Sequence, residues 1–160
     1  MILILVRHGK AEERSPQRND DDRELTKEGR MEMERNAQGL SALIDSNHPI
    51  VLLTSPLVRA RQTAEYLQKE LSLSAIETEN ALEDGSLQDF VRALKRFPED
   101  ATVIATGHEP FCSSWLGRIT GTRVDFRKGA AAGIRIDRLS PLEGKLLFYL
   151  NPESLARMIS

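Results

Sequence analysis

Met1-Ile-Leu-Ile-Leu-Val-Arg-His-Gly9 begins the chain, and its pattern guides the interpretation of the rest. Five apolar residues run without a break from Ile2 to Val6, and two polar residues and a glycine follow at once. A continuous apolar run that ends at glycine indicates a strand buried on both faces. Open α/β sheets bind their ligands just beyond the carboxyl ends of such strands. Arg7 and His8 therefore lie where an α/β protein places its chemistry.

Two further apolar runs, residues 50–54 and 101–106, also end in polar residues. Ser55-Pro56 follows the first of them, and Gly107-His108 follows the second. Serine is a good helix N-cap and proline suits the first helical position, so a helix is expected to begin at Ser55-Pro56.

The remaining segments are interpreted from periodicity and from helix and turn signals. Residues 80–85 are expected to form a loop and 140–144 a turn. The pattern predicts helices over 26–45, 56–71, 87–94 and 111–119, a short strand over 74–78, strands over 130–137 and 145–150, and a short helix after Asn151-Pro152. This order predicts a three-layer α/β/α fold, in which a mostly parallel central sheet carries an antiparallel C-terminal hairpin.

Length and composition restrict the class of protein. At 160 residues, with 40% hydrophobic and 29% charged residues, the chain is expected to form one globular domain over 1–160. The formal net charge of −2 predicts no general nucleic-acid-binding surface, and no apolar run approaches membrane-spanning length. The lone Cys112 excludes an internal disulfide and fits a reducing compartment, so a cytoplasmic protein is expected. Oligomeric state cannot be inferred from these features.

Arg59 lies in the first turn of the helix predicted after Ser55. A basic residue in a first turn is unfavourable for the helix dipole. A charge placed against local preference points to a functional demand, and an anion bound at that helix start would satisfy it.

The three strand ends are expected to meet at one edge of the sheet, because successive parallel strands present their carboxyl ends there. This would bring Arg7, His8, Arg59 and His108 into one pocket. Arginine matches phosphate oxygens bidentately, and a phosphoryl group carries a charge of about −1.5 to −2 at neutral pH. The pocket is therefore predicted to bind phosphate.

A neutral histidine can attack phosphorus and form a covalent intermediate that water then hydrolyses. We expect a backbone carbonyl near Gly9 to hold one ring nitrogen of His8 and so to fix the attacking one. The flanking arginines are expected to lower the pKa of His8 and keep it unprotonated.

A metal site is the alternative use of two histidines. Glu109, next to His108, is the one Cys, Asp or Glu ligand at these strand ends, and the adjacent arginines disfavour a cation. Structural roles for either histidine taken alone also remain open, but four such residues at three strand ends favour phosphate chemistry.

These motifs resemble the histidine phosphatase superfamily, the phosphoglycerate mutase-like group. The resemblance rests on Val6-Arg7-His8-Gly9, on Leu25-Thr-Lys-Glu-Gly29, on Thr54-Ser-Pro-Leu-Val-Arg-Ala-Arg-Gln-Thr-Ala64 and on Gly107-His-Glu-Pro110. It implies that His8 is the phosphate-accepting nucleophile, that Arg7, Arg59 and His108 complete the phosphate pocket, and that neither a metal nor another cofactor is required. The short chain is similar to the small bacterial phosphohistidine phosphatases, which implies an open site for a phosphoryl group displayed on a signalling protein.

Glu83 and Asp84 are the candidate general acids. Many superfamily members that cleave phosphate esters carry a Glu about midway along the chain. The segment that carries these two carboxylates, Ala81-Leu-Glu-Asp-Gly85, cannot be aligned clearly with that position. Imidazole is a better leaving group than an alkoxide and needs less help from an acid. The ambiguity favours a phosphoramidate substrate, while a plain solvated loop is equally compatible with both carboxylates.

Three functions follow as hypotheses. The first is a metal-independent phosphatase that removes phosphate from phosphohistidine in a protein through a phosphohistidine intermediate. The second is a phosphomonoesterase for a small metabolite or sugar phosphate, and the third is a phospho-binding module without turnover. The polar segment 10–24 is interpreted as a solvated loop or as a flap over the pocket, and Arg123, Arg127 and Lys128 as solvated surface or as a basic patch for an acidic partner.

Overall fold

A computed structural model describes residues 1–159. Its six strands form one sheet in the order β3-β2-β4-β1-β5-β6. The strands are β1 (Ile2–Arg7), β2 (Ile50–Thr54), β3 (Glu77–Thr78), β4 (Thr102–Gly107), β5 (Ala131–Leu139) and β6 (Leu142–Leu150). The helices are α1 (Lys27–Ser41), α2 (Val58–Leu71), α3 (Ala81–Asp84), α4 (Leu87–Leu94), α5 (Phe111–Thr120) and α6 (Pro152–Arg157), with a 3-10 turn, η1 (Asp20–Asp22).

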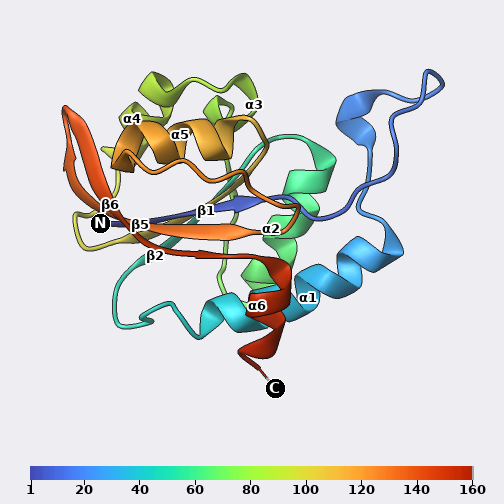
Figure 1. Ribbon diagram of the computed structural model, residues 1–160, viewed down its shortest axis with the longest axis horizontal. Coiled ribbons are helices and arrows are strands. Elements are labelled where there is room, and N and C mark those ends of the chain that lie inside the picture. The colour runs from blue at the N-terminus through green and yellow to red at the C-terminus, as the bar shows by residue number, and fades with distance from the viewer. Residues whose placement is uncertain (160) are drawn as a thin grey trace.

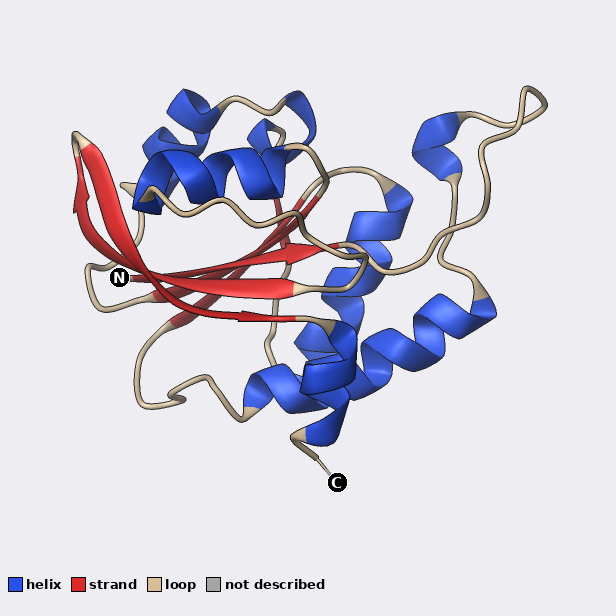
Figure 2. Ribbon diagram, viewed as in Figure 1, coloured by secondary structure: helices blue, strands red, loops and turns tan. Residues whose placement is uncertain are grey.

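The predicted fold class is confirmed. Strands β3, β2, β4 and β1 run parallel, whereas β5 is antiparallel to β1 and forms a hairpin with β6. Helices cover both faces of the sheet, with α4 and α5 on one side and α1 and α6 on the other (Figures 1 and 2). The first apolar run is a central strand as expected, and its residues 3–6 are at most 1% exposed.

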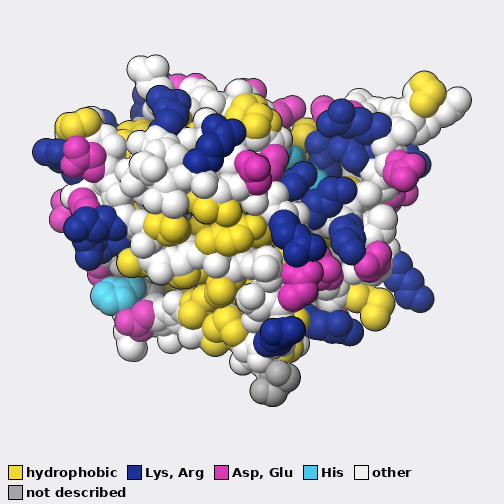
Figure 3. Space-filling view, in the orientation of Figure 1, with side chains coloured by type: hydrophobic (Ala, Val, Ile, Leu, Met, Phe, Trp, Pro, Cys, Tyr) yellow, Lys and Arg dark blue, Asp and Glu magenta, His cyan; other side chains and the backbone are white. Residues whose placement is uncertain are grey.

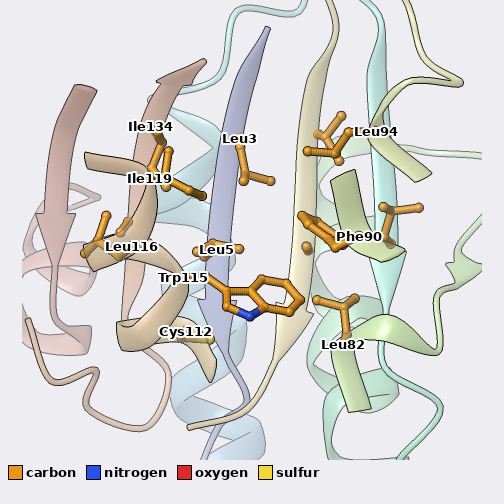
Figure 4. Packing of buried hydrophobic residues seen from close by; sticks show 14 of the residues in the cluster. Leu3, Leu5, Leu82, Phe90, Leu94, Cys112, Trp115, Leu116, Ile119 and Ile134 are labelled. Atoms are coloured by element: carbon orange, nitrogen blue, oxygen red, sulfur yellow. The ribbon is translucent and has the colours of Figure 1, made fainter. Parts of the chain in front are cut away.

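Two apolar clusters hold the layers together, one on each face of the sheet. Alternation along β1 sends Leu3 and Leu5 into one cluster and Ile4 and Val6 into the other. The first cluster continues into α3, α4 and α5, where Phe90 and the indole of Trp115 stack with ring centroids 4.8 Å apart (Figure 4). The second joins α1, α2 and α6.

The helix predicted to begin at Ser55-Pro56 begins instead at Val58, so the prediction of Ser55 as its N-cap is wrong. Ser55 still continues the strand, because its backbone N–H donates to the Thr106 carbonyl across the sheet at 3.0 Å. Its hydroxyl accepts from the Leu57 N–H at 3.2 Å and lies 2.7 Å from His108 Nε2. The Ser55 side chain, which local preference favours as a helix cap, therefore contacts His108 instead.

Other boundaries differ from the prediction by local rearrangements. Helix α1 begins after its N-cap Thr26, close to the expected start, but ends at Ser41 rather than at residue 45. Residues 81–84 of the predicted loop form α3, and the strand expected over 74–78 is reduced to β3. In the hairpin, β5 and β6 are longer than expected and Ser140-Pro141 alone connects them. Helices α4 and α6 begin where expected, with the side chains of Ser86 and Asn151 as their N-caps.

Candidate active site

The register of the central strands brings the predicted site residues together. Arg7 pairs with Gly107 between β1 and β4, and Thr54 pairs with Thr106 between β2 and β4. One residue further on, the His8 N–H donates to the Gly107 carbonyl at 3.0 Å. The rings of His8 and His108 consequently lie with their centroids 5.2 Å apart at the carboxyl ends of adjacent strands.

His8 is held in one tautomer. Its Nδ1 lies 2.7 Å from the Gly9 carbonyl oxygen, and because a carbonyl can only accept, Nδ1 carries the proton. This contact confirms the expected backbone partner. Burial is the main cause that lowers the pKa of His8 to about 3, with smaller effects of His108, Arg59 and Arg7, although the Gly9 contact opposes them. The expected lowering is present, but desolvation rather than the arginines dominates it.

His108 is also buried and neutral. Burial first, and then Arg59 and Arg7, lower its pKa to about 4. The Ser55 hydroxyl already accepts from Leu57, so its own proton is free to be donated to His108 Nε2. In that arrangement Nδ1 of His108 carries a proton, and this buried atom has no partner within residues 1–159.

The guanidinium group of Arg7 is fixed by the loop that precedes β5. Its Nη1 donates to the Phe126 carbonyl at 2.7 Å. Glu109 holds the same loop against α5, since its Oε2 accepts from the Phe126 N–H at 3.2 Å and its Oε1 from the Ser113 N–H at 2.7 Å. Both carboxylate oxygens of Glu109 thus support the position of Arg7.

Arg59 projects from the first turn of α2 and its side chain is 6% exposed. Thr63, one turn later, bridges helix and strand end, because its hydroxyl donates to the Arg59 carbonyl at 2.8 Å and accepts from the Gly9 N–H at 3.2 Å. The guanidinium donates to Asp20 of η1, through Nη1 to the carbonyl at 2.9 Å and through Nη2 to the carboxylate at 3.3 Å.

These residues surround a cavity of about 270 Å³. In the space-filling view, Lys and Arg side chains gather around a small area of exposed histidine, on the side where the segment 8–26 lies (Figure 3). The Nε atoms of Arg7 and Arg59 are buried and unpartnered within residues 1–159, so both arginines keep an unused donor. The cavity is lined by Arg7, His8, Ala11, Arg14, Arg23, Arg59, His108, Glu109 and Lys128.

The two candidate general acids do not line this cavity, although their helix α3 lies beside the end of β4, where Leu82 approaches Gly107. Glu83 and Asp84 lie on α3 and are not among the residues that line the cavity. Glu109, considered as a metal ligand, is engaged with backbone amides, and residues 1–159 contain no group of three or more His, Cys, Asp and Glu side chains arranged to hold a metal. No helix of the described chain is long and apolar enough to cross a membrane.

Sequence reasoning missed four contributors to the site: Arg14, Arg23, Thr63 and the supporting role of Glu109. The two arginines belong to a charged segment without periodicity, so nothing in the sequence separates them from solvated surface. Lys128, interpreted from the sequence as solvated surface or as part of a basic patch, is exposed and lines the cavity, whereas its neighbour Arg127 pairs with Glu153 at 3.2 Å. Thr63, four residues after Arg59, could have been found from its helical spacing.

Buried strand-end histidines beside arginines in an α/β fold form a site suited to an anion, and comparison with known proteins gives the family. Residues 3–102 match the model of the histidine phosphatase superfamily (branch 1). An uncharacterised protein of Picosynechococcus sp. (strain PCC 7002) is 36% identical over 142 residues, which is 84% of this chain and 85% of that protein. The chain belongs to the histidine phosphatase superfamily.

Solved structures agree in fold. The protein histidine phosphatase SixA complexed with tungstate superposes with a TM-score of 0.82 at 25% identity, covering 97% of this chain and 99% of that one. A mycobacterial glucosyl-3-phosphoglycerate phosphatase with inorganic phosphate has a TM-score of 0.72 at 14% identity, covering 95% of this chain and 98% of that one. The fold thus occurs in proteins whose described substrates differ.

Proposed function

We propose that this protein is a metal-independent phosphatase that removes the phosphoryl group from phosphohistidine in a protein, with His8 as the nucleophile. The observation that carries the proposal is the state of His8. Its Nδ1 proton is committed to the Gly9 carbonyl and burial keeps the ring neutral. Nε2, which has no hydrogen-bond partner within residues 1–159, is therefore left with a lone pair.

In the first step, Nε2 of His8 attacks phosphorus, the P–N bond to the substrate imidazole breaks, and its electron pair leaves with the substrate nitrogen. The guanidinium groups of Arg7 and Arg59 and the ring of His108, which all line the cavity, stabilise the charge on the equatorial oxygens. In the second step, water attacks the phosphoryl group on His8, which releases inorganic phosphate and restores the neutral ring.

The choice of a P–N bond is supported by the carboxylates around the cavity. Cleavage of an ester needs an acid to protonate the departing alkoxide, whereas imidazole leaves more readily. Glu83 and Asp84 do not line the cavity, and both oxygens of Glu109 accept backbone hydrogen bonds. The similarity to SixA supports the same choice.

A phosphomonoesterase for a small metabolite is the second candidate, and one observation favours it. Glu109 is the single carboxylate among the lining residues, and its position beside His108 would suit an acid if its hydrogen bonds to the backbone were exchanged. Turnover of phosphate esters at rates similar to phosphohistidine would favour this candidate.

Acid-quenched incubation with a labelled phosphoryl donor tests the proposal. Wild type should acquire an acid-labile, base-stable label and release phosphate from a phosphohistidine peptide, and His8→Ala should lose both. His48→Ala is the matched control, because His48 is an exposed loop histidine outside the cavity. Absence of both label and phosphate release in wild type would leave a phospho-binding module, and loss of activity on chelation would revive the metal site.

A further inference from the structure

The cavity carries more positive charge than one phosphoryl group can neutralise. Five cationic side chains line it, while both histidines are neutral at physiological pH. Two carboxylates oppose them, Glu109 in the lining and Asp20 beside it, so the cations exceed the carboxylates by three. A phosphoryl group brings a charge of about −1.5 to −2 at neutral pH. The five cations are Arg7, Arg14, Arg23, Arg59 and Lys128.

The surplus is located at the rim, on the exposed side chains of Arg14 and Lys128, whereas His8 is buried. Arg7 and Arg59 act on the charge of both histidines, and their guanidinium groups match phosphoryl oxygens. Arg14 and Lys128 come from two different loops, the one that follows β1 and the one that precedes β5. Lys128 has neither a hydrogen bond nor an ion pair within the described residues 1–159, and Arg14 shares its single partner, Asp20, with Arg23 and Arg59.

The space in the cavity agrees with this distribution. Its volume of about 270 Å³ is several times the share of about 30 Å³ that one water molecule takes in the liquid. A phosphoryl group at His8 therefore leaves room for the groups that neighbour it in the substrate. Those groups would face Arg14 and Lys128.

From the charge, the position and the space, we propose that Arg14 and Lys128 form a second anion-binding position that recognises a negatively charged group next to the phosphoryl group of the substrate. This inference takes the reaction, removal of a phosphoryl group, from the proposed function. The binding preference for a second anionic group does not depend on that function. In a protein substrate the group would be an acidic residue beside phosphohistidine, and in a small substrate it would be a carboxylate.

Two pairs of ligands distinguish an acidic residue in a protein substrate from a carboxylate in a small substrate. One is a phosphohistidine peptide with Glu beside the phosphorylated residue against the same peptide with Gln. The other is phosphoserine against phosphoethanolamine, which differ by one carboxylate. Affinities are measured by calorimetry on the His8→Ala protein, which does not depend on turnover, and wild-type kcat/KM is measured in parallel.

The anionic member of at least one pair should bind about fivefold more tightly, as expected for charge pairs at a partly exposed rim. The double substitution Arg14→Gln/Lys128→Gln should remove that preference. Arg18→Gln/Arg127→Gln removes the same charge from the same two loops, at residues that pair with Glu12 and Glu153 and do not line the cavity, and should keep the preference.

The outcomes are separable. Equal affinity within both pairs, or a preference that survives Arg14→Gln/Lys128→Gln, would overturn the second anion position even if wild type is an active phosphatase. A preference that the double substitution removes, found in a wild-type protein without turnover, would support the second position and overturn the proposed function.

Discussion

The floor and the rim of the cavity use similar side chains but hold them differently. The floor, defined here as His8, Arg59 and His108, follows strand ends or the first turn of α2, and each residue is 5–7% exposed. The rim, defined as Arg14 and Lys128, comes from loops, and the Arg14 side chain is 79% exposed. Strand register fixes the floor, whereas in the rim Arg14 has one solvent-exposed ion pair of small energy and Lys128 has no partner within residues 1–159.

This difference matches the two proposed roles, the reaction at the floor and the substrate preference at the rim. A reacting group must be placed precisely enough for in-line attack, which a buried sheet edge provides, and desolvation there also keeps both histidines neutral. Loops tolerate substitution at low cost and suit the recognition of a variable neighbour of the phosphoryl group. Substitutions in the floor should therefore change the rate strongly, and those in the rim should change the preference among substrates.

Arg59→Lys should cause the largest effect in this comparison, a loss of about 100-fold in kcat/KM. Lysine keeps the charge but cannot supply the planar pair of donors that a phosphoryl group requires. Steady-state phosphate release measures the loss, with Arg61→Lys as the matched control, because Arg61 lies on the same helix and does not line the cavity. A loss below about threefold would show that the floor works through charge alone.

The floor could be predicted from the sequence because its causes are local. Apolar runs that end in Arg7-His8, Ser55 and His108 indicate parallel strands, and parallel strand ends must converge. The rim could not be predicted, because Arg14 lies in a segment without periodicity. That segment reaches the floor through Asp20 and Arg59, which are 39 residues apart. A contact between distant residues also explains why the cap predicted at Ser55 was wrong. The Ser55 hydroxyl contacts His108, 53 residues away, and this contact overrides the local preference for a cap.

The neutral state of the two histidines in the floor also predicts a pH dependence of stability. His108 has a pKa of about 4 in the folded protein and about 6.5 when unfolded, so between these values the unfolded chain binds the proton and the folded chain does not. Stability contributed by neutral His108 is thus lost as pH falls below about 6.5. Between pH 7 and 5 the loss should be about 2 kcal/mol for this residue.

Urea unfolding of wild type and His108→Gln at pH 7 and 5 measures this effect. The stability difference between the two proteins should shift by about 2 kcal/mol in favour of the variant at the lower pH. His48→Gln, at an exposed loop position, serves as the control and should follow wild type. A difference that stays constant with pH would mean that His108 is not kept neutral by the fold.

Asp20→Asn tests the residue that contacts both Arg59 of the floor and Arg14 of the rim. Burial opposes ionisation of Asp20, but the guanidinium groups of Arg23, Arg59 and Arg14 hold its pKa below the usual range, so it is an anion that competes for Arg59. Removing its charge should tighten inhibition by inorganic phosphate by about threefold, because the contact is partly exposed. Asp21→Asn, at the exposed neighbouring position, should have no effect. Weaker inhibition in Asp20→Asn would show that Asp20 orients Arg59 rather than competing for it.

The smallest effect is expected from Glu83→Gln/Asp84→Asn, which should leave cleavage of phosphohistidine within about twofold of wild type. Neither carboxylate lines the cavity, and an imidazole leaving group needs little help from an acid. Cleavage of phosphate esters is measured on the same preparations, because it shows whether these carboxylates act as an acid for an ester substrate. Wild type could cleave esters, and the double substitution could lose that activity while it keeps phosphohistidine cleavage. In that case α3 supplies an acid after movement toward the floor. If both activities fall together by tenfold or more, the carboxylates act in the common first step, and their absence from the cavity lining does not favour a P–N substrate.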